Sequence, residues 1–333
     1  MLSTTPAFFA LVLIGTFFLA PVKAQCDSIL ERREWRTLND TEKASYINAV
    51  KCLQAHPALD PPFEGPVSRF DEFQAYHVKI ADDVHAVGEF LPWHRLYLKN
   101  YENALRSECG YIGAGPYWDW TQDADATGTI SKSPIFDPVT GFGGDGVPGT
   151  YTLPPFGNDS RITPEVFRGC VQDGPFANYT LNVGPGKLIT QHCLVRGFQD
   201  SFSKYLTTAA VTNTTNLLTF DDFRKEVEGH PFTDDFRMHD GGHVAVGGEM
   251  SNFFSSPGDP LFFLHHANID RIWWQWQQKD AARLYEIAGP ATLVEPVHNV
   301  TLDYALVMGS LGPTLPIRDI MDISSKPSCY AYI

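Results

Sequence analysis

The chain has 333 residues, with 39 Asp or Glu against 25 Lys or Arg, so its formal net charge at pH 7 is -14. This acidic balance disfavours nucleic acid and anionic membranes, and we expect neither as a partner. We expect one domain over residues 25–333, because no linker, repeat or block of like charge interrupts that stretch.

Residues 1–24 have the pattern of a secretory signal peptide. Their apolar stretch, Phe8 to Leu19, is too short to span a bilayer and is followed by the small-residue pattern Val22-Lys23-Ala24. A positive charge before the apolar stretch is missing, so a buried N-terminal helix is the alternative. We favour cleavage after Ala24 and a secreted protein, since no later apolar run reaches membrane-spanning length.

The cysteines and the glycosylation sequons agree with secretion. The 6 cysteines form an even set without a C-x-x-C pair, which in an oxidising compartment indicates disulfide bonds. Of the possible pairings we expect Cys26–Cys329 and Cys170–Cys193. Ser or Thr stands two residues after each sequon asparagine, so we expect N-glycans at Asn39, Asn158, Asn178, Asn213 and Asn299.

Hydrophobic periodicity predicts a mainly α protein. Capping residues mark two helix starts, Asn39 and Thr219, and a proline, Pro92, marks a third. Gly and Pro gather in two stretches that we interpret as long ordered loops with a few short strands nearby. The expected helices span 39–56, 69–80, 93–105, 219–228, 235–244 and 258–278, and the loops span 141–157 and 174–186.

Two of the later helices carry histidines suited to binding a metal. His239 and His243 are four residues apart, which places both imidazoles on one helix face. His265 or His266 in the last helix can complete a set of three. Three neutral imidazoles without thiolate or carboxylate suit copper, zinc or iron.

A second histidine set lies upstream. His77 continues the apolar stripe of the 69–80 helix, and His94 stands near the start of the next helix. We expect His85 in the loop between them, because a Gly and a Pro follow it closely. Four helices that each direct histidine inward predict a four-helix bundle around a buried dinuclear metal site.

The sequence around these histidines carries a specific series of motifs: EFLPWHR at 89–95, PYWDW at 116–120, H-x-x-x-H at 239–243 and DPLFFLHHANIDRIW at 259–273. In this order they resemble the tyrosinase, catechol oxidase and haemocyanin proteins, which hold a coupled dinuclear (type 3) copper site. The short secreted fungal tyrosinase-like enzymes are the most similar subgroup. The resemblance implies that the first copper is held by His77, His85 and His94, and the second by His239, His243 and His266.

The resemblance selects His266 over its neighbour His265. Adjacent helical side chains point about 100° apart, so both cannot easily bind one metal. We expect His265 to be a hydrogen-bonded core histidine. Asp270 is expected to accept a hydrogen bond near the site or to anchor helix packing. The other histidines that lack a partner at ligand spacing are interpreted as surface or structural residues: His56, His192, His230 and His298.

Four further positions are expected to control the substrate. Phe236 stands where many relatives place a glutamate that holds a water. Asp240 follows His239, and we expect it to accept the proton of a monophenol if its carboxylate faces the cavity. Val244 follows His243. Phe253 is expected to cover the first copper. Asp83 stands where many relatives have a cysteine bonded to a ligand histidine, so that thioether is absent.

The resemblance implies a secreted enzyme that uses two copper ions and O2 to oxidise small o-diphenols to o-quinones, with slower o-hydroxylation of monophenols. A haemocyanin-like oxygen carrier and a zinc hydrolase are the alternatives, since three histidines also suit catalytic zinc. The end of the chain, Tyr330-Ala331-Tyr332 and one more residue, resembles the close of the catalytic core. We therefore expect no C-terminal shielding domain, activity without proteolysis, and a monomer or small oligomer.

Overall fold

The computed structural model of the protein describes residues 1, 25–156 and 164–333. The expected signal peptide and the sequon at Asn158 lie outside the described residues. Eight α-helices occur in the described part of the chain: α1 Asp40–Ala55, α2 Arg69–Val84, α3 Phe90–Cys109, α4 Thr121–Thr127, α5 Thr208–Thr215, α6 Phe220–Glu228, α7 Met238–Val246 and α8 Leu261–Gln278. None of these helices is both long and apolar enough to cross a membrane.

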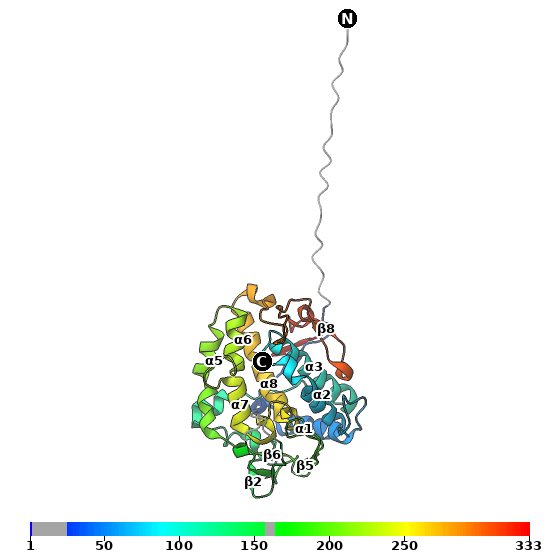
Figure 1. Ribbon diagram of the computed structural model, residues 1–333, viewed down its shortest axis with the longest axis vertical. Coiled ribbons are helices and arrows are strands. Elements are labelled where there is room, and N and C mark those ends of the chain that lie inside the picture. Colours follow the sequence, from blue (N-terminus) through cyan, green and yellow to red (C-terminus); the bar gives the residue numbers. More distant parts are fainter. Residues whose placement is uncertain (2–24, 157–163) are drawn as a thin grey trace.

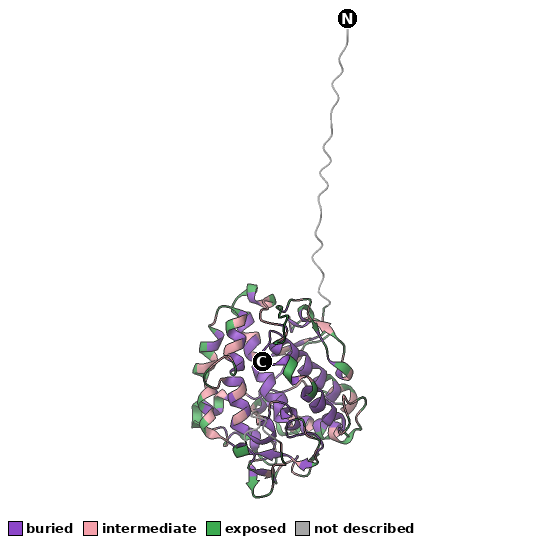
Figure 2. Cartoon of the chain, in the orientation of Figure 1, coloured by how far each residue is buried: buried purple, intermediate pink, exposed green. Residues whose placement is uncertain are grey.

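Helices α2, α3, α7 and α8 form the predicted four-helix bundle (Figure 1). Helix α8 packs against both α3 and α7, and α2 packs against α3. Aromatic rings fill the interior: Tyr97 lies 5.8 Å from Phe73 and 5.8 Å from Phe263, measured between ring centroids. Figure 2 shows the inner helices buried along most of their length, with exposed residues at the periphery. The fold is thus mainly α, as the periodicity indicated.

Helix starts agree with the sequence where a capping side chain marks them. Asn39 and Glu42 form the reciprocal capping box expected at α1, with bonds of 3.0 and 2.9 Å. Helix α3 begins at Phe90, three residues before the expected start. Pro92 sits inside its first turn, where a missing N–H removes no helical hydrogen bond. Helix α7 begins at Met238 and not at 235.

Two short helices were not predicted. Helix α5 reads TAAVTNTT, a composition of weak helix propensity, and α4 has only 7 residues. Thr207 caps α5 by accepting a hydrogen bond from the Ala210 N–H at 3.2 Å. Local periodicity in such short segments is too weak to indicate a helix.

Nine short strands surround the bundle in the described residues: β1 Leu30–Arg32, β2 Gly146–Pro148, β3 Gly169–Val171, β4 Thr180–Leu181, β5 His192–Cys193, β6 Val195–Arg196, β7 Ala305–Leu306, β8 Leu315–Pro316 and β9 Tyr330–Tyr332. β1 and β9 pair in parallel, and β2, β3 and β6 form an antiparallel sheet. The remaining pairs are β4 with β5 and β7 with β8. Most of the strands lie in or beside the loop regions that join the helices, as expected.

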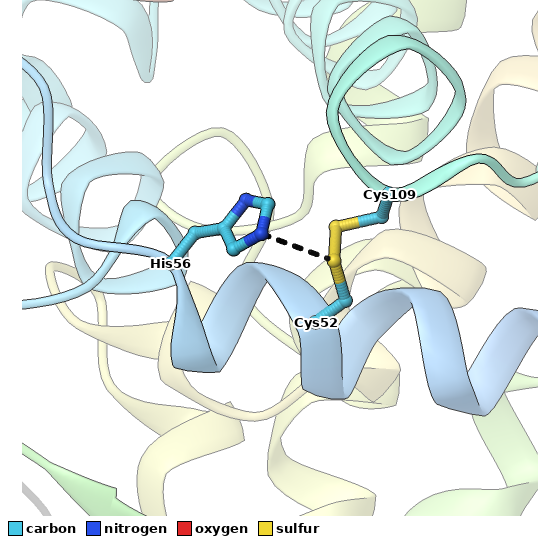
Figure 3. A group of neighbouring side chains, drawn as sticks. All are labelled: Cys52, His56 and Cys109. Carbon is cyan, nitrogen blue, oxygen red and sulfur yellow. Dashed lines mark hydrogen bonds between the residues drawn. A yellow bond between two sulfur atoms is a disulfide. The ribbon is translucent and has the colours of Figure 1, made fainter.

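Three disulfide bonds tie this framework together. Cys26–Cys329 and Cys170–Cys193 confirm the expected pairs, and the third is Cys52–Cys109. The third joins α1 to the end of α3, and His56 Nε2 lies 3.7 Å from Cys52 Sγ (Figure 3). Because the two sulfur atoms are bonded to each other, this cysteine–histidine group offers no thiolate to a metal.

A buried polar cluster joins both ends of the described chain to the bundle. The Asp270 carboxylate on α8 accepts from Arg95 Nε at 2.5 Å and from the hydroxyls of Tyr330 and Tyr332, both at 2.6 Å. Arg32 Nη1 lies 3.6 Å from the same carboxylate. These bonds run to α3, β1 and β9 and not to a histidine, so Asp270 is the packing anchor.

The same cluster makes acid stability depend on Glu102. This buried carboxylate accepts from Arg32 at 3.0 Å and from Lys99 at 2.9 Å. Burial alone would raise its pKa from 4.5, but Arg32 and Lys99 outweigh burial and lower the pKa to about 2. A lowered carboxyl pKa stabilises the fold above the unfolded value, and that stabilisation is lost as pH falls toward 2.

We therefore expect Glu102→Gln to destabilise the protein near neutral pH by roughly 3 kcal/mol, the equivalent of the pKa shift. The difference between parent and variant should shrink as pH falls from 4.5 to about 2. Urea unfolding of both proteins across that range checks this. A difference independent of pH would show that Glu102 acts by shape and not by charge.

Candidate metal centre

The first histidine triad comes from α2, its C-terminal end and α3. His77 lies in the middle of α2, His85 is the first residue after α2, and His94 lies in the first two turns of α3. All three are buried, and each contributes a ring nitrogen lying within 4.8 Å of the other two. The loop position expected for His85 is confirmed.

The second triad comes from α7 and α8. His239 and His243 stand one turn apart on α7, with ring centroids 4.8 Å apart, and His266 projects from α8. The ring of His266 lies 5.1 Å from that of His239 and 5.2 Å from that of His243. Their ring nitrogens also lie within 4.8 Å of one another.

The two triads face each other across the bundle. The rings of His94 and His266 stack with centroids 4.5 Å apart and planes at 12°. His85 and His239 lie 6.1 Å apart, again nearly parallel. Two metal ions held by these triads would therefore occupy adjacent positions.

Backbone carbonyls orient five of the six imidazoles. A carbonyl oxygen can only accept, so the ring nitrogen facing it must carry the proton and the other must offer its lone pair. Both nitrogens are therefore assigned by their neighbours. The Nδ1 bonds are His77 to Phe254 (2.7 Å), His85 to Ala81 (2.8 Å), His94 to Phe90 (2.8 Å), His239 to Glu228 (3.2 Å) and His243 to Met250 (2.6 Å).

The free nitrogens fit a metal. The Nε2 atoms of His77, His94 and His239 are buried, and no hydrogen-bond partner reaches them among the described residues. Buried polar atoms are rarely left without a partner, so each of these lone pairs fits a bound metal ion, which accepts an electron pair. His266 lacks an orienting carbonyl, but its ring stacks on Phe262 at 4.1 Å. The donor set of six imidazoles suits two copper ions.

The rings are also held neutral, which metal binding requires. Burial lowers the pKa of His77, His94, His239 and His266 well below the usual 6.5, and their imidazole neighbours lower it further. Burial lowers the pKa of His85 and His243 to about 4. The imidazoles are thus neutral near neutral pH, as metal ligands must be, and the Nε2 atoms of His243 and His266 face each other at 3.1 Å.

One short segment holds both triads in place. Within residues 249–255, the Met250 carbonyl orients His243 and the Phe254 carbonyl orients His77. Glu249 fixes the segment by accepting from His192 Nε2 and Ser255 Oγ, both at 2.7 Å. Burial alone would lower the pKa of His192, but Glu249 raises it above its usual value. His192 is therefore structural, as expected.

His265 behaves as the expected core histidine. Its Nε2 donates to the His239 carbonyl at 3.1 Å, and its Nδ1 accepts from Trp120 Nε1 at 3.3 Å. Both ring nitrogens are therefore engaged. The ring lies so close to α7 that a Cβ on Gly242 would meet it at 2.4 Å, which explains the glycine in MHDGGH.

A pocket of about 540 Å³ opens onto the triads. His85, His239 and His243 line it, so it reaches histidines of both triads. The four positions singled out in the sequence also line it: Phe236, Asp240, Val244 and Phe253. The Phe253 ring lies 4.8 Å from that of His85 and so contacts one histidine of the first triad.

Asp240 borders the pocket, but its carboxylate is already engaged. It accepts from the backbone N–H groups of Arg237 (2.6 Å), Gly241 (2.8 Å) and His230 (3.0 Å), and from His230 Nδ1 at 2.7 Å. Asp240 is the third residue of α7, and its carboxylate accepts hydrogen bonds from backbone N–H groups around the start of that helix. Its role in positioning α7 is therefore clear from the geometry.

The sequence did not place His230 or Glu228 in the pocket. His230 pairs with Asp240 and contacts the Phe236 ring at 4.6 Å, so it belongs to the pocket and not merely to the surface. Glu228 is buried, and its Oε2 finds no hydrogen-bond partner within the described ranges. Burial raises its pKa to about 8. In the sequence the only signal for Glu228 is its place at the acidic end of α6. It stands eleven residues before His239, whereas the glutamate of many relatives would stand three residues before it, at Phe236.

Two facing triads of neutral imidazoles, beside a pocket of this size, define the centre of a dinuclear copper protein. Comparison with known proteins gives the same class. Residues 67–279 match the profile of the common central domain of tyrosinase. The chain belongs to the tyrosinase family of type 3 copper oxidoreductases, whose members bind two copper ions.

Relatives match over most of their length. The chain is 37% identical over 332 residues to the tyrosinase-like protein phomQ1' of Diaporthe leptostromiformis, covering 92% of this chain and 81% of the relative. It is 30% identical over 370 residues to the N-acetyl-6-hydroxytryptophan oxidase ivoB of Emericella nidulans, covering 100% and 99%. A polyphenol oxidase structure from Thermothelomyces thermophila matches with a TM-score of 0.82 and 33% identity, covering 93% and 90%.

Proposed function

We propose that the protein is a secreted o-diphenol oxidase that uses O2 to convert small catechols into o-quinones, with slower o-hydroxylation of monophenols. The observation that carries this proposal is the pocket lined by histidines of both triads and by three apolar side chains, Phe236, Val244 and Phe253. Such walls accept a flat aromatic ring. The relatives named as tyrosinase-like protein and polyphenol oxidase agree with phenol oxidation.

In this proposal the six triad histidines are the copper ligands, and residues 25–333 are one catalytic domain. His77, His85 and His94 hold the first ion, and His239, His243 and His266 hold the second. When bound there, the copper pair supplies the two-electron exchange between the phenol and O2. The protein contributes neutral imidazoles fixed by carbonyls, and the aromatic rings around them exclude water.

Approach of the substrate is set by Phe253 and Val244. Phe253 lies over His85 of the first triad, so the ring of a catechol enters beside His239 and His243 of the second. Asn252, Ser251 and Ser256 give the pocket a polar side that can hydrogen-bond to phenolic hydroxyls. A bulky or highly charged phenol, such as a protein tyrosine, fits this entrance poorly.

We expect slow monophenol hydroxylation because neither Phe236 nor Asp240 offers a free base. A phenol loses its proton with a pKa of about 10, so hydroxylation needs an acceptor close to the metal. Phe236 is apolar, and the Asp240 carboxylate already accepts from three backbone N–H groups and from His230. A catechol needs less help, because its oxidation requires no ring hydroxylation.

We expect oxygen uptake by the copper-loaded protein to be much faster with catechol than with a matched monophenol. Asp240→Ala is expected to lower the catechol rate and the monophenol rate by a similar factor, because it leaves backbone N–H groups around the start of α7 without their acceptor. Initial rates on 4-methylcatechol and 4-methylphenol, with copper content measured in parallel, check both statements. A loss confined to the monophenol would instead make Asp240 the proton acceptor, and equal parent rates would contradict the proposed preference.

Secretion and glycosylation are also part of this proposal. Three disulfide bonds favour an oxidising compartment. The sequon asparagines in the described ranges are all exposed, as glycan attachment requires: Asn39, Asn178, Asn213 and Asn299. We propose a monomer or small oligomer in the extracellular space.

A further inference from the structure

A second cavity, of about 470 Å³, adjoins the substrate pocket. The two share Asp82 and Leu293 in their walls, so they meet along one edge. The walls of the second cavity are formed by the end of α2, by Glu89 and Trp93 at the start of α3, and by residues 291–294 and 304–307. We call this second cavity the arm cavity. A catechol in the first pocket does not need it.

The rim of the arm cavity exposes apolar side chains. Leu293, Val294 and Val307 line it and are 59%, 74% and 53% exposed. Three large apolar side chains that remain more than half exposed around one cavity are characteristic of a surface that binds something apolar. Leu293 lines both cavities, so it lies where an apolar ligand that reached from one to the other would pass.

Glu89 gives the arm cavity a polar recognition point. Glu89 is 4% exposed, and the Tyr304 hydroxyl, which also lines the cavity, interacts with its carboxylate. Its Oε2 has no hydrogen-bond partner among the residues that the structure describes. A buried carboxyl oxygen left unpaired costs free energy, and a ligand that donates a hydrogen bond would remove that cost.

The charges around Glu89 select the kind of ligand. Asp82, Asp83 and Lys79 line the same cavity, and Asp82 is paired with Lys187 at 2.8 Å. Burial, with a smaller contribution from Asp83, raises the Glu89 pKa to about 8. An ammonium beside Glu89 favours its ionised form, in which the free oxygen accepts the N–H, whereas a carboxylate-bearing ligand adds a negative charge beside Asp83 and Glu89.

We propose that the arm cavity binds the substituent of an extended phenolic substrate: an apolar arm that carries an N–H donor, either an ammonium or an amide, to Glu89. The aromatic ring would lie in the first pocket and the arm would pass Leu293. The proposal rests on the function proposed above and narrows its substrate class. It places Glu89, Val294 and Val307 among the residues that determine specificity.

Turnover of matched catechols tests the proposal. Catechol is compared with catechols that carry the same alkyl chain ending in an ammonium, an N-methylamide or a carboxylate. We expect kcat/KM to be highest for an N–H-bearing arm and lower for the carboxylate than for catechol itself. Whether ammonium or amide is preferred identifies the donor. An unchanged or reversed order would overturn the proposal.

Variants locate the effect. Glu89→Gln should lower the ratio of kcat/KM for the ammonium-armed catechol to that for catechol by roughly tenfold. The double substitution Val294→Ser and Val307→Ser, at exposed positions that do not threaten folding, should lower the ratio for every armed catechol. Leu218→Ser is the matched control, because Leu218 is 77% exposed and lines neither cavity. Ratios equal to the parent's in both sets of variants would remove the arm cavity from substrate binding.

Binding to copper-free protein separates the two proposals. Calorimetric titration with a phenyl-capped alkylamine, and with the alkanoate of the same length, needs no turnover. Tighter binding of the amine, weakened by Glu89→Gln, supports the arm cavity even if the loaded protein oxidises no phenol. Equal binding of amine and alkanoate, or binding of neither, contradicts it even if catechol is oxidised.

Discussion

His239→Ala is expected to leave one copper ion per chain where the parent binds two, and to remove nearly all phenol oxidation. His239 belongs to the second triad, and its buried Nε2 is unpaired within the described residues. Without it only two imidazoles remain for that ion, while the three histidines of the first triad are untouched. Two ions are needed because one copper exchanges only one electron.

Metal analysis and electron paramagnetic resonance check this result. The cupric parent should be silent because its two ions are close enough to couple, whereas the variant should show the signal of an isolated cupric ion. His265→Ala is the matched control: it removes a neighbouring buried histidine whose nitrogens bond to the His239 carbonyl and Trp120. It should keep two ions. One ion in the parent, or a full cupric signal from it, would contradict the dinuclear assignment.

Asp270→Ala is expected to destabilise the fold by roughly 3–5 kcal/mol, the usual cost of leaving a buried partner charge uncompensated. Arg95 loses its 2.5 Å ion pair, and two tyrosine hydroxyls lose their acceptor. These groups come from α3 and β9, so the substitution weakens the packing of both elements against α8. Urea unfolding of the copper-free protein measures the effect without interference from the metal.

Asp303→Ala provides the control for that measurement. Asp303 pairs with Arg318 at the surface, where its side chain is 77% exposed, and exposed pairs contribute little. Its unfolding midpoint should match that of the parent. A loss from Asp270→Ala no larger than the loss from Asp303→Ala would show that the buried cluster does not stabilise the fold.

The bundle could be predicted because its helices are long and strongly patterned. Phe70, Phe73 and His77 mark the buried face of α2 in the sequence, and all three are buried. Boundaries were less accurate where the start depends on more than a capping side chain. Pro92 indicated a helix start but sits in the third position of α3, and the acceptor at the start of α7 is Asp240, inside the helix.

The triads could be predicted because ligand spacing and the surrounding motifs are local in the sequence. The pocket wall could not. Glu228 and His230 reach it from the end of α6 and the turn that follows, and no spacing rule links them to His85. The arm cavity brings residue 89 beside residue 304, a neighbourhood that only the folded chain creates.

Substitutions in segment 249–255 are expected to affect both triads, because carbonyls of this segment orient a histidine in each. Met250 orients a histidine of one triad and Phe254 a histidine of the other, and the bonds from His192 and Ser255 to Glu249 hold both carbonyls. A substitution that displaces this segment therefore disturbs both metal positions. Loss of both ions from such a variant would not show that a ligand had been removed. Both sites depend on this one segment for the orientation of a histidine.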